Sequence, residues 1–131
     1  MPKIPYVGNE LSWVSWESLK YGVGTYGSDP IANAKREVDI LKDAGANIIS
    51  ISMEKGTWEQ KTIKYDEIIN YAQNQGMALL LKTFPEPGTR IPISVFESYI
   101  VNIASRYKPE FMEAYNEPFS PSSAPTWQRI Q

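Results

Sequence analysis

The sequence of 131 residues contains no cysteine and no histidine. These absences exclude disulfide bonds, thiol nucleophiles, histidine-based catalytic triads and zinc sites with the usual ligands. Any acid–base chemistry must therefore use aspartate, glutamate, lysine or tyrosine side chains. The absence of cysteine is compatible with either side of a membrane, so the sequence indicates no cellular compartment.

A strong charge of one sign and long apolar runs are also lacking. The 13 basic and 15 acidic residues are interspersed and give a net charge of −2. Because no basic stripe is present, we expect no nucleic-acid partner. No apolar run is long enough to span a bilayer, and residues 1–5 lack the apolar core of a signal peptide, so we expect no membrane partner. The length and the hydrophobic content of 42% are typical of one globular domain.

Strand-like and helix-like segments alternate along most of the chain. Residues 1–16 have no regular pattern, and we interpret them as a lead-in to a domain formed by residues 17–131. Residues 19–26 are predicted to form the first strand. The segment Ser28-Asp29-Pro30 predicts the start of a helix, because serine and aspartate cap free amide groups and proline suits the first helical position. The apolar stripe of this helix consists of Ile31, Ala34, Val38 and Leu41.

Gly45 is placed to end this helix in a left-handed conformation. Residues 47–53 predict strand two, and residues 54–62 predict a loop. A second helix over residues 64–75 and a third strand over residues 77–81 follow.

The exit loop of the third strand is predicted at residues 84–88. Ser94 and Glu97 have the spacing of a capping box, which predicts the start of the third helix. Pro109 is expected to end that helix, and residues 111–115 predict strand four. The apolar stripe of the third helix consists of Phe96, Ile100, Ile103 and Tyr107.

The predicted order is therefore β-α-β-α-β-α-β, with a repeat of about 30 residues. Such alternation predicts an α/β fold with a parallel sheet and right-handed crossovers. Two architectures fit this order: about four strands of a (β/α)8 barrel, which is a partial TIM barrel, or an open doubly wound sheet.

One motif favours the open sheet. Gly22, Gly24 and Gly27 satisfy the G-x-G-x-x-G pattern of dinucleotide-binding folds, and Glu54 could serve as the acid that binds the ribose. However, residues 17–20 are polar for a central strand, and Asp29-Pro30 starts the helix beyond the last glycine. Because the amides of the helix start must face the pyrophosphate, we keep a dinucleotide-binding domain only as the weaker alternative.

A second motif, Asn116-Glu117-Pro118, follows the fourth predicted strand, at the end where barrel enzymes carry catalytic groups. Here the chain resembles the clan of retaining glycoside hydrolases with (β/α)8 barrels, and most of all its cellulase-like family. The resemblance implies that Glu117 is the acid/base and that Asn116 hydrogen-bonds the 2-hydroxyl of a bound sugar. Residues 41–49 and the glycine-rich exit of strand one are also similar to this clan, which needs no cofactor.

The resemblance also implies what this chain does not contain. A retaining glycosidase needs a second carboxylate as nucleophile, which this clan carries on strand seven, whereas four strands are recognisable here. We therefore expect the N-terminal half of a barrel that a second chain or a C-terminal half completes. We expect negligible activity of the chain alone. A non-catalytic half-barrel that binds carbohydrate or a partner chain is the main alternative.

Other candidate residues lie near predicted strand ends. Glu113 alternates onto the face of Glu117, and we expect it to form a structural ion pair with Lys82. Glu54 and Glu86 are expected in exit loops, either solvated or in contact with substrate. Aromatic rings can stack on the C–H face of a sugar or pack under loops, and the candidate substrate contacts of this kind are Tyr26, Trp58, Phe84 and Trp127.

Overall fold

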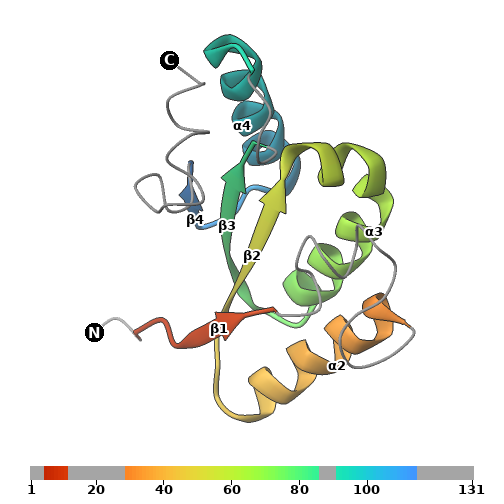
Figure 1. Ribbon diagram of the computed structural model, residues 1–131. Coiled ribbons are helices and arrows are strands. Elements are labelled where there is room, and N and C mark those ends of the chain that lie inside the picture. The colour runs from red at the N-terminus through yellow and green to blue at the C-terminus, as the bar shows by residue number, and fades with distance from the viewer. Residues whose placement is uncertain (1–4, 12–28, 86–90, 115–131) are drawn as a thin grey trace, which may run out of the picture.

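The computed structural model describes residues 5–11, 29–85 and 91–114, in which four strands and three helices alternate (Figure 1). The strands form one parallel sheet in the order β1-β2-β3-β4. This arrangement confirms the predicted α/β fold of β/α repeats. In chain order the elements are β1 (Gly8–Glu10), α2 (Pro30–Asp43), β2 (Ile48–Glu54), α3 (Lys55–Asn74), β3 (Ala78–Phe84), α4 (Ile93–Tyr107) and β4 (Phe111–Glu113).

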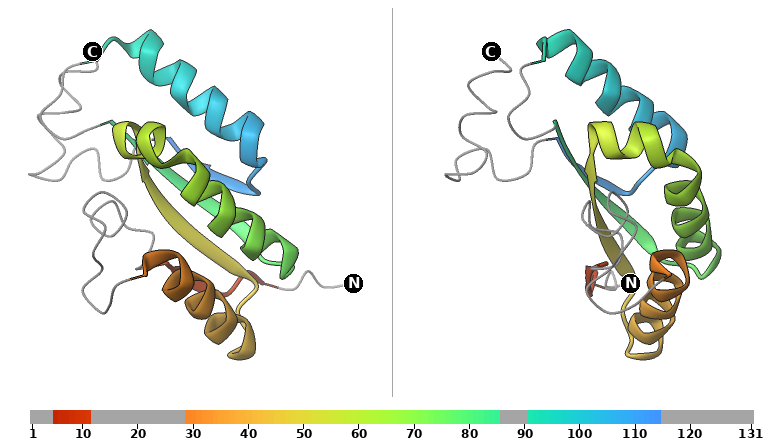
Figure 2. Two further views of the ribbon diagram at one scale, coloured as in Figure 1. Left: turned by 90° about the vertical axis from the view of Figure 1, so that its right-hand side faces the viewer. Right: turned by 45° about the vertical axis from the view of Figure 1, so that its right-hand side comes forward.

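The three helices cover one face of the sheet (Figure 2). Alternate residues of β2 and β3 point toward them and are fully buried, as the pleat of a strand requires. These residues are Ile49, Ile51, Met53, Leu79, Leu81 and Thr83. Consecutive strand order with all helices on one side is the arrangement of strands along an arc of a (β/α) barrel.

An aromatic contact shows that the sheet curves toward its other face, which we call the open face. Tyr6 precedes β1 and Phe111 begins β4, so they belong to the two opposite edges of the sheet. Their rings nevertheless meet edge to face, with centroids 5.1 Å apart. Four flat strands would separate the two edges by about 14 Å, and a concave open face brings such side chains together.

The first helix forms as its sequence predicts. The Asp29 carboxylate accepts hydrogen bonds from the amides of Ile31 and Ala32, each at 3.1 Å, and Pro30 is the first helical residue. Of the predicted stripe, Ala34 and Val38 are fully buried, while Ile31 and Leu41 pack against the core. Gly45 follows the helix with a φ of +94°, in the left-handed region that favours glycine.

The strand beside β2 lies earlier in the chain than predicted. The sequence assigned this strand to residues 19–26, but Gly8–Glu10 pairs with β2, inside the segment interpreted as irregular. Residues 12–28 lie outside the described part. Asn47 fixes the early strand, since its amide donates to the Val7 carbonyl and its side-chain oxygen accepts from the Val7 amide, both at 2.8 Å. Three residues are too few to show a period, which is why the pattern missed this strand.

The helix after β2 also begins earlier than predicted. Residues 54–62 were expected to form a loop, yet α3 starts at Lys55 and bends at Lys61, whose φ of −123° is not helical. Thr57 and Trp58 in this first part are buried. Their burial stabilises a helical segment whose own propensity is weak because of Gly56.

The capping box predicted at Ser94 and Glu97 is wrong. Helix α4 begins at Ile93 after Pro92, which makes no side-chain cap, so Ser94 already lies inside the helix. The predicted apolar stripe is confirmed, with Phe96, Ile103 and Tyr107 buried and Ile100 packed against them. The helix ends at Tyr107, two residues before Pro109. Among the described residues, no helix combines the length and apolar character needed to cross a membrane.

Candidate functional site

The open face carries a row of polar side chains, one from each strand. The register places Ser52 of β2 beside Lys82 of β3, and Lys82 beside Glu113 of β4. The Ser52 hydroxyl donates a hydrogen bond to the Glu10 carboxylate, which joins β1 to the row. Ser52, Lys82 and Glu113 are half-buried and Glu10 is exposed, so all four remain accessible. We call Glu10, Ser52, Lys82 and Glu113 the polar row.

The ion pair predicted between Lys82 and Glu113 is not formed. The register aligns the two residues, but no ion pair joins them in the part of the chain that the structure describes. Both side chains reach water on the open face, and an exposed pair gains little net free energy over two solvated charges. Both groups are thus available for contact with a ligand.

Two hydrogen bonds from β3 fix the strand that leads to the Asn-Glu-Pro motif. At the start of β4, the Glu110 carboxylate accepts from the Leu79 amide at 2.7 Å. At its end, the fully buried Thr83 hydroxyl lies 3.2 Å from the Glu113 carbonyl and 3.1 Å from the Ala114 carbonyl. Hydrogen bonds from β3 therefore hold β4 at both of its ends.

Several predicted site residues lie outside the described residues. These are Tyr26, Glu86, Asn116, Glu117 and Trp127. The structure describes two of the aromatic residues predicted to contact substrate. Phe84 is the last residue of β3, is half-buried and lies in register with Glu54. The other, Trp58, lies on α3 rather than in a loop, and its side chain is 6% exposed.

Trp58 belongs to a hydrogen-bonded chain between α3 and α4. Its indole N–H donates to the Tyr107 hydroxyl at 2.8 Å, and that hydroxyl donates to the Asp66 carboxylate at 2.7 Å. Asp66 also accepts two hydrogen bonds from Arg106. The hydrogen bonds from Arg106 and, to a smaller extent, Tyr107 lower the pKa of Asp66 below its ordinary value, against an opposing effect of burial.

Glu54 is a buried strand-end carboxylate rather than the predicted loop residue. Its side chain is 1% exposed and accepts a hydrogen bond from the Thr57 hydroxyl at 3.0 Å. Burial, and secondarily the charge of Glu54, raises the pKa of Tyr65 above its ordinary value. Glu54 thus packs at the start of α3 instead of facing solvent at the strand ends.

The sequence pattern does not indicate Glu10 as a site residue, because residues 1–16 show no regular periodicity. The available signal was Gly8, which must be glycine where β1 meets β2. A Cβ added there would lie 1.7 Å from the Ile48 carbonyl oxygen. Gly8 thus lies at a close approach of two backbones, which is one of the places where a strand contains glycine.

The polar row offers hydrogen-bonding and charged groups on the open face. No cluster of three or more ligand side chains occurs within residues 5–11, 29–85 and 91–114. Comparisons with protein-family models, curated proteins and solved structures found no match.

Proposed function

We propose that this chain provides the acid/base half of a retaining glycoside hydrolase. Glu117 is the acid/base, and Asn116 binds the 2-hydroxyl of the sugar at the cleavage point. The observation that carries the proposal is that the Asn-Glu-Pro motif begins three positions after the last residue of β4, in a parallel sheet with consecutive strand order. Catalytic groups of barrel enzymes occupy this end of the strands.

The chemistry of retaining hydrolysis needs two carboxyl groups with different roles. Glu117 donates its proton to the departing glycosidic oxygen while a second carboxylate attacks the anomeric carbon and forms a glycosyl–enzyme bond. Glu117 then accepts a proton from the water that breaks this bond. The second carboxylate comes from strands outside the four described here, so the reaction needs the completed barrel.

The polar row supports a polyhydroxylated substrate. Carboxylate, hydroxyl and ammonium groups together accept from and donate to sugar hydroxyls. The row lies on the open face and includes Glu113 of β4, which precedes Glu117 by four residues in the sequence. A sugar in the barrel can therefore contact the row while its glycosidic oxygen faces Glu117.

The test compares Glu117→Gln with Glu113→Gln in the completed barrel, in which a second chain or a C-terminal half supplies the remaining strands. For aryl glycosides, Glu117→Gln should slow hydrolysis strongly when the leaving group is poor, by about 100-fold or more, and much less when it is activated. Glu113→Gln should change both substrates to a similar, smaller extent. Equal losses for both leaving groups in Glu117→Gln would contradict the acid/base role.

The 131-residue chain alone provides a second check. It should hydrolyse no aryl glycoside, because it lacks the nucleophile that the proposal places elsewhere. Robust turnover by the purified chain would contradict this arrangement. A different outcome would favour a non-catalytic half-barrel that binds carbohydrate. In that case the completed barrel would show no turnover, and it would bind sugar saturably with an affinity that Glu117→Gln leaves unchanged.

The consecutive strand order weighs against the dinucleotide alternative. Doubly wound sheets bind their cofactor where the strand order reverses, and the four described strands contain no reversal. A titration with NAD(H) that shows saturable binding would restore that alternative.

A further inference from the structure

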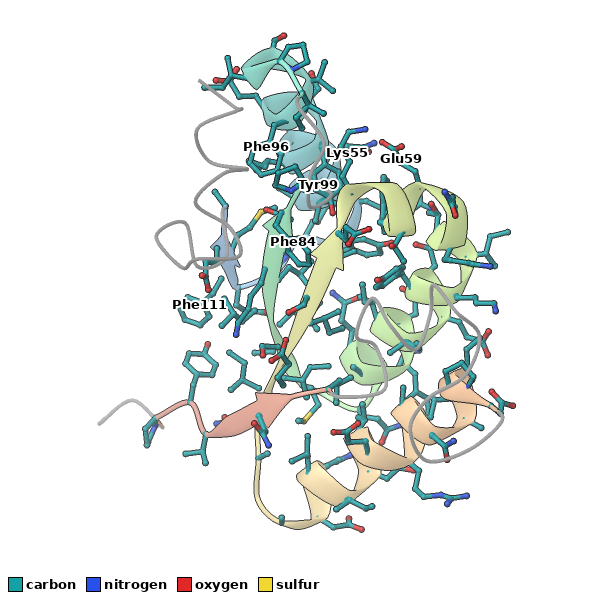
Figure 3. The ribbon with its side chains drawn as sticks, viewed as in Figure 1. Lys55, Glu59, Phe84, Phe96, Tyr99 and Phe111 are labelled. Atoms are coloured by element: carbon teal, nitrogen blue, oxygen red, sulfur yellow. The ribbon has the colours of Figure 1, made fainter. Side chains whose placement is uncertain are left out.

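A groove lies on the helix side of the sheet, between the first turns of α3 and the first half of α4. Its volume is about 380 Å³, within the range of small-ligand sites. Figure 3 shows Lys55 and Glu59 at the start of α3 beside Tyr99 of α4. The lining consists of Lys55, Trp58 and Glu59 from α3, and Ser94, Val95, Ser98, Tyr99 and Asn102 from α4.

The floor of this groove is aromatic. Trp58 and Tyr99 lie with ring centroids 5.8 Å apart and are 6% and 4% exposed. Their polar ends are already bonded inside the protein, because Trp58 donates to the Tyr107 hydroxyl and Tyr99 donates to the Met53 carbonyl at 2.8 Å. The small part of each ring that reaches the groove is therefore ring carbon, which favours contact with C–H groups.

One wall carries a regular row of uncharged polar groups. Ser94, Ser98 and Asn102 are exposed and lie four residues apart on α4, so they recur about every 6 Å along the helix. The Ser98 hydroxyl donates to the Ser94 carbonyl at 2.9 Å, which leaves its oxygen free to accept. The Asn102 amide can both donate and accept.

The other wall is charged but locally neutral. Lys55 and Glu59 form an ion pair one helical turn apart on α3. The pair cancels the charge of each partner, so neither an anion nor a cation gains a net attraction in the groove. An extended, uncharged ligand with hydroxyl groups at regular spacing and apolar C–H faces fits both walls and the floor.

We propose that the groove binds a segment of a neutral oligosaccharide, without cleaving it. The only carboxylate in its lining, Glu59, is ion-paired, so the groove lacks the two carboxyl groups that hydrolysis needs. The proposal rests on the groove alone and stands whether or not the chain forms part of a hydrolase.

The experiment is an NMR titration of the ¹⁵N-labelled 131-residue chain with cellohexaose and, separately, maltohexaose. At least one should cause saturable shift changes at the amides of Ser94, Ser98 and Asn102 and at the Trp58 indole. Ser98→Trp fills the groove and should weaken binding about tenfold or more. Val101→Trp, at an exposed position of α4 that does not line the groove, is the matched control and should leave binding unchanged.

Two further variants complete the test. Asn102→Ala removes one hydrogen-bonding group at an exposed position and should weaken binding about fivefold, so it decides the matter if Ser98→Trp fails to fold. Glu117→Gln should leave binding unchanged, which separates the groove from the proposed hydrolytic site. The proposal is overturned if neither hexasaccharide shifts the groove signals, or if binding persists in Asn102→Ala and Ser98→Trp at full strength.

Discussion

The two faces of the sheet have opposite characters although they share the same strands. On β3, Leu81 faces the helices and is fully buried, whereas Leu80 and Lys82 on either side of it are half-buried on the open face. The same alternation on β2 separates buried Ile51 from Ser50 and Ser52. The covered face carries the buried apolar core, whereas the open face carries the accessible polar row.

The largest expected effect comes from replacing leucine with alanine on the two faces of β3. Leu81→Ala should destabilise the protein by about 3 kcal/mol, because it leaves a cavity in the core. Leu80→Ala should cost about 1 kcal/mol, since its side chain is already partly in water. Urea unfolding of both variants gives the comparison. Equal losses would mean that the open face is packed as tightly as the core.

A smaller effect is expected in the layer between α3 and α4. Tyr107→Phe removes the acceptor of the buried Trp58 N–H and should cost about 2 kcal/mol in the free energy of unfolding. Tyr6→Phe is the control, because Tyr6 is 53% exposed on the open-face side. If the two variants unfold at the same urea concentration, the helix layer does not depend on this hydrogen-bonded chain.

The pH dependence of stability should reveal Asp66 in the same layer. The folded-state pKa of Asp66 is lowered from its ordinary value of 3.8. The ionised carboxylate therefore contributes to the free energy of unfolding above pH 3.8, and this contribution is lost as the pH falls through the folded-state pKa. Below about pH 4, Asp66→Asn should therefore lose less stability than the unaltered chain. Urea unfolding at pH 7 and at pH 3 measures the difference, and identical pH profiles would contradict the role of Asp66.

The smallest effect is expected in the polar row. Ser52→Ala removes the hydrogen bond to the exposed Glu10 and should change the free energy of unfolding by about 0.5 kcal/mol or less. Thermal unfolding is sufficient to detect a larger change. A loss close to that of Leu81→Ala would show that the polar row holds the fold together and would remove the contrast between the faces.

The open face was only partly predictable. The alternation of side chains along a strand predicted the face on which Glu113 lies. Sequence spacing does not predict that Glu113 forms no ion pair with Lys82, or that Ser52 donates a hydrogen bond to Glu10. Those contacts depend on strand register, which long-range pairing sets. The burial of Trp58 and Glu54 was missed for a related reason, because α3 extends into a segment whose local pattern predicts a loop.

The sequence by itself determined the alternation of strands and helices, the caps at Asp29 and Gly45, and the apolar stripes of α2 and α4. These features depend on neighbours a few residues apart, whose periodicity and turn chemistry act locally. Only the tertiary structure decided that residues 8–10 form β1, that Tyr6 meets Phe111, and that one residue from each strand joins the polar row. Each of these results joins segments about 30 or more residues apart, and only the packed sheet brings such segments together.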